Sequence, residues 1–238
     1  MDTARFMQNM ADIRLRLEAA AAQGGHPVPT LVAVTKKVSD AAFLAAAGAG
    51  CTVAENYPQA FARRYDLLCG AMAPPPMHLV GSLQTNKVKL VVGKAALIHS
   101  LDSRRLAEAI ERQAERAGVV QDVLLEVNSA REPNKGGLLP EDVRPLAEFV
   151  RELPHIRLRG LMTMGKNDGI KEHFRPYFAQ TRRLFEALLQ SGLFEGEPIL
   201  SMGMSDSFEI AAQEGATLVR VGTALFAGAD EPQAMPRI

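Results

Sequence analysis

The chain has 238 residues, of which 47% are apolar and 23% are charged. Lys and Arg total 27, as do Asp and Glu, so no net positive field would draw the chain to nucleic acid or to an anionic membrane surface. The length is sufficient for one large hydrophobic core, and α/β barrels of this size are usually single domains. One domain is therefore expected over residues 1–238.

The cysteine count and the chain ends indicate a compartment. Cys51 and Cys69 are too few for a disulfide framework and form no C-x-x-C motif. The first residues contain an early acid and no apolar h-region, and the longest uncharged stretch, residues 41–54, is too short to cross a bilayer. We expect a cytoplasmic protein with no membrane and no nucleic acid among its partners. The five histidines show no metal-ligand spacing.

The first predicted element is a helix over residues 4–22, whose apolar positions recur at helical spacing before Gly24 and Gly25 end it. Short apolar runs then alternate with helical segments. Strands are predicted at residues 30–35, 51–54, 77–81, 96–99, 121–127, 156–161, 197–200 and 217–221. Helices are predicted at residues 39–48, 57–68, 84–92, 103–117, 140–151, 171–191 and 205–213, with a short one after Thr223.

Continuous apolar strands separated by helices are typical of a parallel sheet that is covered on both faces. Eight such units predict a (β/α)8 TIM barrel of the α/β class with an extra amino-terminal helix, and a doubly wound open sheet is the alternative. In a barrel the chemistry collects at the carboxyl ends of the strands, and phosphate commonly binds after strands seven and eight. The functional site is therefore expected at that mouth.

Lys36 lies at the carboxyl end of the first core strand. Solvent is partly excluded at such a mouth, which favours the reactive free amine, and a lysine amine can form a Schiff base. Lys37 is adjacent, and both lysines would be ordinary charges if the loop is simply solvated. Strand alternation places Lys36 with Val32 and Val34 but does not decide which set faces inward.

Two turns near the end of the chain are suited to an anion. The segment Ser201-Met-Gly-Met-Ser-Asp offers hydroxyls, a glycine and free N–H groups at a helix start. Its alternative is a plain junction in which Asp206 caps the helix with Glu209 in a capping box. Gly222 and Thr223 after the last strand provide a second such turn, which favours phosphate binding.

A phosphate site combined with a strand-end lysine fits pyridoxal phosphate or a sugar phosphate in a Schiff-base aldolase. Arg220 lies in an apolar strand, so it must find a partner or reach outward to an ion pair. For pyridoxal phosphate it could face the ring nitrogen, since arginine is a recognised partner of that atom. His78, His99 and Lys135 are weaker candidates, with core, positioning and solvated-loop roles as their alternatives.

These residues resemble the pyridoxal phosphate homeostasis protein family, the YggS/PROSC family, which shares the barrel of the alanine racemase amino-terminal domain (fold type III). The resemblance covers nearly the whole chain. The motifs that carry it are Leu31-Val-Ala-Val-Thr-Lys, Glu55-Asn-Tyr, His78-Leu-Val-Gly-Ser-Leu-Gln-Thr-Asn-Lys, Ile98-His-Ser-Leu-Asp-Ser, Gly160-Leu-Met-Thr-Met, Leu200-Ser-Met-Gly-Met-Ser-Asp and Val219-Arg-Val-Gly-Thr-Ala-Leu-Phe.

The resemblance implies that Lys36 holds pyridoxal phosphate as a Schiff base. It also implies a set of cofactor-binding residues around that lysine: Ser201, Gly222 and Thr223 at the phosphate, Arg220 near the pyridine nitrogen and Asn56 beside the ring. The chain departs from the family pattern after the lysine, where Lys37-Val38-Ser39 replaces the common Thr-Lys-Pro. We expect this change to alter loop geometry and not the identity of the ligand site.

An arginine at the ring nitrogen disfavours its protonation and makes the ring a poorer electron sink. The racemase relatives also need a second, β-rich domain that contributes a tyrosine base, and this chain ends at Ile238. The resemblance therefore implies a non-catalytic binding protein in intracellular vitamin B6 and amino-acid homeostasis, expected as a monomer, with pyridoxal-phosphate-requiring apo-enzymes as candidate partners. A single-domain racemase is the alternative, although no residue is an obvious base.

Overall fold

A computed structural model describes residues 1–230, and eight parallel strands close into a barrel in the order β1 to β8. The strands are β1 (Thr30–Val34), β2 (Thr52–Glu55), β3 (Met77–Leu79), β4 (Leu97–Leu101), β5 (Gln121–Val127), β6 (Ile156–Thr163), β7 (Ile199–Ser201) and β8 (Leu218–Val221). The predicted TIM barrel is confirmed and the doubly wound sheet is wrong. The single-domain prediction extends to residues 231–238, which lie outside the described residues.

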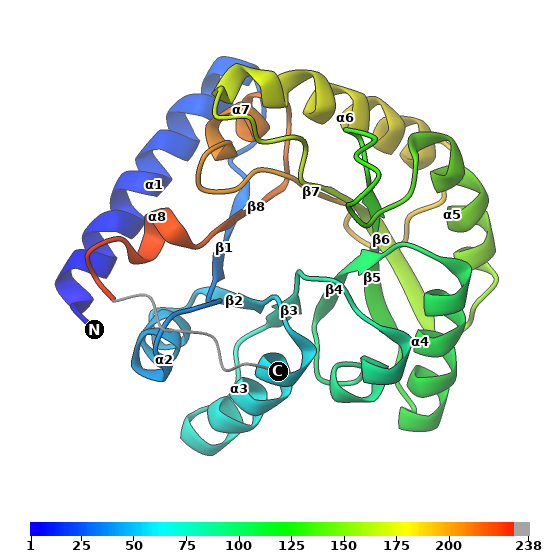
Figure 1. Ribbon diagram of the computed structural model, residues 1–238, viewed down its shortest axis with the longest axis horizontal. Helices are drawn as coiled ribbons and strands as arrows, with labels where there is room; N and C mark the ends of the chain where they lie inside the picture. The colour runs from blue at the N-terminus through cyan, green and yellow to red at the C-terminus, as the bar shows by residue number, and fades with distance from the viewer. Residues whose placement is uncertain (231–238) are drawn as a thin grey trace.

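Helices surround the barrel on its outside (Figure 1). The α-helices are α1 (Thr3–Gly24), α2 (Asp40–Gly48), α3 (Pro58–Ala71), α4 (Arg104–Ala117), α5 (Val143–Arg151), α6 (Arg175–Gln190), α7 (Phe208–Gln213) and α8 (Thr223–Phe226). Short 3-10 helices are η1 (Thr85–Leu90), η2 (Pro140–Asp142) and η3 (Lys171–Phe174). The helix predicted at residues 84–92 is therefore a 3-10 turn.

The extra amino-terminal helix α1 is confirmed and lies beside α7 and α8 (Figure 1). Its buried Asn9 side chain donates hydrogen bonds to the carbonyls of Leu225 and Ala227, at 3.0 and 2.9 Å. The carbonyl groups at the end of α8 are thus satisfied by α1. None of the helices over residues 1–230 combines the length and apolarity needed to span a membrane.

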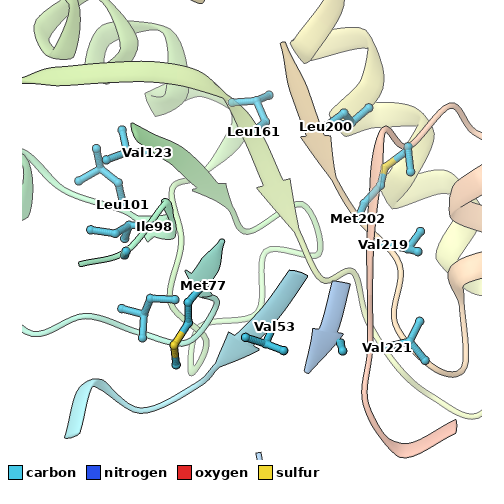
Figure 2. Packing of buried hydrophobic residues seen from close by; sticks show 14 of the residues in the cluster. Val53, Met77, Ile98, Leu101, Val123, Leu161, Leu200, Met202, Val219 and Val221 are labelled. Atoms are coloured by element: carbon cyan, nitrogen blue, oxygen red, sulfur yellow. The ribbon is translucent and has the colours of Figure 1, made fainter. Parts of the chain in front are cut away.

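Alternate strand residues divide between two cores. One set packs against the helices, and Figure 2 shows part of it, with side chains that include Val53, Met77, Val123, Leu161 and Val219. The other set fills the barrel interior in two smaller clusters. These contain Val32, Val34, Ala54 and Leu218, and Leu97, Leu124 and Met162.

This division decides the orientation that strand alternation left open. Val32 and Val34 belong to the interior set, while Ala33 packs against the helices. Strand β1 ends at Val34, and Lys36 lies in the turn that follows, where strand alternation no longer applies. The hydroxyl of Thr35 donates to Glu55 Oε1, which also accepts from Arg64 of α3.

The segment before α7 differs from the prediction. The helix begins at Phe208, after a turn over residues 205–207 in which the N–H groups of Ser207 and Phe208 both donate to the carbonyl of Met204. Ser207 Oγ accepts the N–H of Met204 at 3.1 Å, and Glu209 is engaged by Arg16 at 2.9 Å. The capping-box alternative is therefore wrong.

Candidate functional site

Two clefts lie at the carboxyl ends of the strands. The first, here called the lysine cleft, has a volume of about 510 Å³ and is lined by residues that include Lys36, Lys37, Gly222 and Thr223. The second, here called the Asn56 cleft, has a volume of about 490 Å³ and is lined by residues that include Asn56, Tyr57, Gly81, Glu126 and Met164. The barrel thus brings the ends of β1 and β8 together on one side of the mouth, as predicted, with β2 next to β1.

Lys36 occupies the second position of a tight turn. The N–H of Val38 donates to the carbonyl of Thr35 at 3.3 Å, and Lys37 between them has φ 63°. A residue other than glycine at positive φ costs roughly 1–2 kcal/mol, so this turn must be held by its surroundings. Both lysines are exposed at the mouth.

The Gly222–Thr223 turn packs closely against β1. A β-carbon at Gly222 would lie 2.8 Å from the carbonyl oxygen of Val34, so only glycine permits this approach. The N–H of Ala224 donates to Ser205 Oγ at 3.2 Å. Ser205 therefore lies at this turn, although it was not singled out from the sequence. The only available signal was its place at the end of the Ser201-Met-Gly-Met-Ser motif.

Ser201 lies inside the barrel and its side chain is 0% exposed. Its hydroxyl accepts from Arg220 Nη1 at 2.6 Å and contacts His99 Nδ1 at 3.1 Å. Arg220 Nη2 donates to the carbonyl of Thr163 at 3.0 Å. Ser201 and Arg220 are thus brought together as buried partners, and the alternative of an outward ion pair for Arg220 is wrong.

A chain of hydrogen bonds crosses the barrel interior from Arg220 to His78. His99 Nε2 lies 3.1 Å from His78 Nδ1, and both imidazoles are buried. A guanidinium can only donate, so the Ser201 hydroxyl accepts from Arg220, and the arrangement that also uses the hydroxyl proton donates it to His99 Nδ1. In this arrangement each histidine carries its proton on Nε2. Burial lowers the pKa of His78 to about 4, and burial, His78 and Arg220 lower that of His99 well below its usual range.

These tautomers can be tested directly. We expect nitrogen NMR of histidine-labelled, ligand-free protein to show His78 and His99 as neutral Nε2–H forms throughout the range from pH 6 to 8, because burial disfavours the imidazolium. Replacing Ser201 with alanine removes the donor to His99 Nδ1, so the His99 signals should move most. A charged or Nδ1–H form of His99 at neutral pH would contradict the direction of this chain.

Asn56 supplies an acceptor with no hydrogen-bond partner among residues 1–230. Its Oδ1 atom is buried without a hydrogen bond, and its backbone is held by Gly81, where a β-carbon would lie 2.1 Å from the Asn56 carbonyl oxygen. A buried acceptor left unpaired costs about 1–3 kcal/mol, so the amide is suited to a donor from a ligand. The residues present therefore fit a polar ligand at the Asn56 cleft.

Glu126 was noted in the sequence only as part of a strand end. Its side chain belongs to the interior set of β5 and lines the Asn56 cleft. Burial, and to a smaller extent the negative charge of Asp102, raise the pKa of Glu126 to about 7. Arg220 opposes this shift. Burial also lowers the pKa of Arg220 to about 10, so the guanidinium stays charged at neutral pH.

Lys135 lies outside the two clefts. Its ammonium pairs with Glu132 at 2.5 Å, and its side chain is 42% exposed. It lines a small crevice with Asn128 and Gly136 beside the mouth. A direct role for Lys135 at the ligand stays a prediction. Within residues 1–230, no group of three or more His, Cys, Asp or Glu side chains is placed to hold a metal ion.

Known proteins are similar to this chain in sequence and in fold. The chain matches the family described as alanine racemase, N-terminal domain, over residues 8–230. A pyridoxal phosphate homeostasis protein of Pseudomonas aeruginosa is 39% identical over 227 residues, which cover 94% of this chain and 95% of that protein. One from Aquifex aeolicus is 46% identical over 172 residues, 72% of this chain and 74% of the relative.

Solved structures agree. PipY of Synechococcus elongatus PCC7942 with PLP bound has a TM-score of 0.80 at 31% identity, covering 93% of this chain and all (100%) of PipY. An alanine racemase of Clostridium difficile 630 has a TM-score of 0.76 at 15% identity and is covered over 57% of its length, which shows the shared fold alone.

The fold and the matched region thus place the molecule in the class of barrels built like the alanine racemase amino-terminal domain. Within that class, the chain belongs to the pyridoxal phosphate homeostasis protein family. The predicted resemblance is confirmed.

Proposed function

We propose that this chain binds pyridoxal phosphate through Lys36 and serves intracellular vitamin B6 and amino-acid homeostasis as a binding protein, not as a racemase. The observation that carries the proposal is the lysine cleft, where Lys36 and the Gly222–Thr223 turn face the same space. A reactive amine and an anion-binding turn are what an aldehyde with a phosphate group requires.

Each part of the cofactor has a candidate partner. The backbone of Gly222 and Thr223, together with the Ser205 hydroxyl, would hold the phosphate, and Asn56 would offer its unpartnered oxygen beside the ring. When bound, pyridoxal phosphate supplies an aldehyde whose carbon an unprotonated lysine amine attacks, forming a C=N bond and releasing water. The role of Ser201 at the phosphate stays a prediction, because its hydroxyl bonds to Arg220 and His99.

The charged guanidinium of Arg220 lies in the barrel floor and supports binding without proton transfer. Its pKa of about 10 keeps it a donor at neutral pH, and a cation near the ring nitrogen disfavours protonation of that atom. His78 and His99 are both buried, and neither lines the lysine cleft or the Asn56 cleft. These features favour holding the cofactor over using it.

Reconstitution tests the proposal. Purified chain mixed with pyridoxal phosphate should acquire visible absorbance, and borohydride reduction followed by peptide mass spectrometry should locate the adduct on Lys36. A chain that stays colourless, or an adduct confined to Lys37 or Lys135, would exclude the proposed site. The racemase alternative predicts rapid exchange of the α-hydrogen of alanine in deuterated water. We expect no exchange above the rate of free pyridoxal phosphate.

Ser205 lies at the Gly222–Thr223 turn and Ser201 lies in the barrel interior, so variants of the two serines test these two places separately. We expect Ser205→Ala to weaken pyridoxal phosphate binding by ~10-fold, because a charged acceptor loses one hydrogen bond worth about 1.5 kcal/mol. Ser201→Ala should instead lower the stability of the ligand-free protein, by about 1–3 kcal/mol, since Arg220 and His99 lose their shared partner. Titration with the cofactor and thermal unfolding measure the two effects. Equal effects of both variants on binding would contradict this assignment.

The further expectations are proposals as well. Pyridoxal-phosphate-requiring apo-enzymes are the proposed recipients, and the monomer is the proposed state. The cytoplasm is the proposed location, supported by Cys51 and Cys69, which are both free thiols. One domain over residues 1–238 is proposed on the closed barrel.

A further inference from the structure

The turn that carries Lys36 is gripped from outside the barrel by an arginine on α3. Arg64 Nη1 donates to the carbonyl of Thr35 and Nη2 donates to the carbonyl of Val38, each at 2.5 Å. Thr35 and Val38 are the first and last residues of the turn, with Lys36 and Lys37 between them. Arg64 is 5% exposed, so its contacts are inside the protein and not on its surface.

Arg64 is itself fixed by a buried carboxylate. Glu55 Oε1 accepts from Arg64 Nη1 and also from Thr35 Oγ1, the latter at 2.6 Å. The guanidinium lies over the Phe43 ring, 4.9 Å from its centroid. Glu55 and Thr35 are 1% and 0% exposed. A planar guanidinium with several donors can bridge two carbonyls and a carboxylate at once, which a neutral side chain cannot do.

Without the hydrogen bonds from Arg64, the turn over residues 35–38 is expected to relax. Lys37 is held at φ 63°, a conformation that persists only where the surroundings enforce it. Loss of Arg64 would leave the Val38 carbonyl without its side-chain donor and the Thr35 carbonyl with only the N–H of Val38, and would free the turn to move. The Lys36 amine would move with it, and small displacements of a reacting group have large effects on reaction.

We propose that Arg64, held by Glu55, is a positioning residue that fixes the turn so that Lys36 projects over the lysine cleft. This inference rests on the proposed function of Lys36. It is distinct from a purely structural role, in which the Arg64–Glu55 pair would stabilise the barrel while Lys36 behaved the same without it. Neither residue lines the lysine cleft or the Asn56 cleft, so both act through the backbone of residues 35–38.

Arg64→Met tests the proposal, with Arg63→Met as the matched control. Arg63 is the preceding residue on α3 and forms an exposed ion pair with Asp40, with both N–O distances 2.6 Å. We expect R64M to bind pyridoxal phosphate ~10-fold or more weakly and R63M to bind like wild type. Arg64→Lys should recover part of the lost affinity, because an ammonium group is still a charged donor. The recovery should be incomplete, because an ammonium group reaches fewer acceptors than a guanidinium.

A second readout needs no cofactor. Acetylation of ligand-free protein, followed by mass spectrometry, gives the relative labelling of Lys36 and Lys37, and we expect this ratio to change in R64M and not in R63M. Circular dichroism sets a temperature at which every variant is folded. If R64M does not fold, the double variant R64M/E55Q removes both charges and leaves none buried alone.

The outcomes separate the two proposals. A folded R64M or double variant with wild-type affinity and a wild-type labelling ratio would overturn the positioning role. A wild-type chain that takes up no pyridoxal phosphate would sink the proposed function, while the labelling ratio would still decide whether Arg64 positions Lys36.

Discussion

Lys36→Ala should abolish the visible absorbance of the reconstituted protein and weaken pyridoxal phosphate binding by ~100-fold or more, equivalent to about 3 kcal/mol. The reason is that the lysine cleft would lose the amine proposed to react with the aldehyde, while the Gly222–Thr223 turn proposed to hold the phosphate would remain. Titration followed by absorbance and by fluorescence measures covalent and total binding separately.

Lys37→Ala is the matched control for this change. Lys37 lines the same cleft and is one residue away, but it lies in the other half of the turn at φ 63°. Alanine keeps that backbone cost, so stability and binding should both stay close to wild type. Loss of absorbance in K37A with retention in K36A would reverse the assignment of the two lysines.

Glu126→Gln should raise the stability of the ligand-free protein at alkaline pH. The folded-state pKa of about 7 lies above the ordinary 4.5, so the folded protein binds this proton more tightly than the unfolded chain. The contribution of the neutral Glu126 carboxyl to the free energy of unfolding is therefore fully present below pH 4.5 and is lost as the pH rises through 7. At pH 8 we expect E126Q to be more stable than wild type by on the order of 3 kcal/mol, with little difference at pH 4.5.

Denaturant unfolding of both proteins across this pH range measures the difference. His78 and His99 have lowered pKa values in the folded protein. Their contribution to the stability of the protein is therefore lost as the pH falls below their ordinary pKa of 6.5, which is the opposite trend. Both proteins contain them, so the comparison isolates Glu126. Glu141→Gln is the control, because Glu141 is exposed and Arg131 lowers its pKa. A pH-independent effect of E126Q would show that Glu126 is charged in the folded protein at neutral pH.

The sequence was sufficient for the order of strands and helices. Apolar runs such as residues 123–125, separated by helical segments, indicate a parallel sheet, since burial on both faces accounts for them. The errors were local. Residues Thr85–Leu90 form a 3-10 helix where an α-helix over 84–92 was predicted, and α7 begins at Phe208, after a turn closed on the carbonyl of Met204.

The candidate site was only partly visible in the sequence. Strand-end position indicated Lys36 and Lys37 together, the family motif selected Lys36, and turn composition indicated Gly222 and Thr223, because all of these are local features of the chain. The contact of Ser205 with Ala224 joins the turn before α7 to the start of α8, across α7 and β8, so no local pattern could indicate it. The same holds for Ser201, whose partners His99 and Arg220 come from other strands.

By itself the sequence determined the barrel, its motifs and the reactive residue types. Only the tertiary structure decided which residues of a strand face the barrel interior, since alternation defines two faces and packing alone distinguishes them. It also decided the environment of the Lys36 turn. Arg64 is 28 residues away in sequence from Lys36 and reaches its turn only because α3 packs against β2, the neighbour of β1 in the barrel, where burial makes each unpaired carbonyl costly.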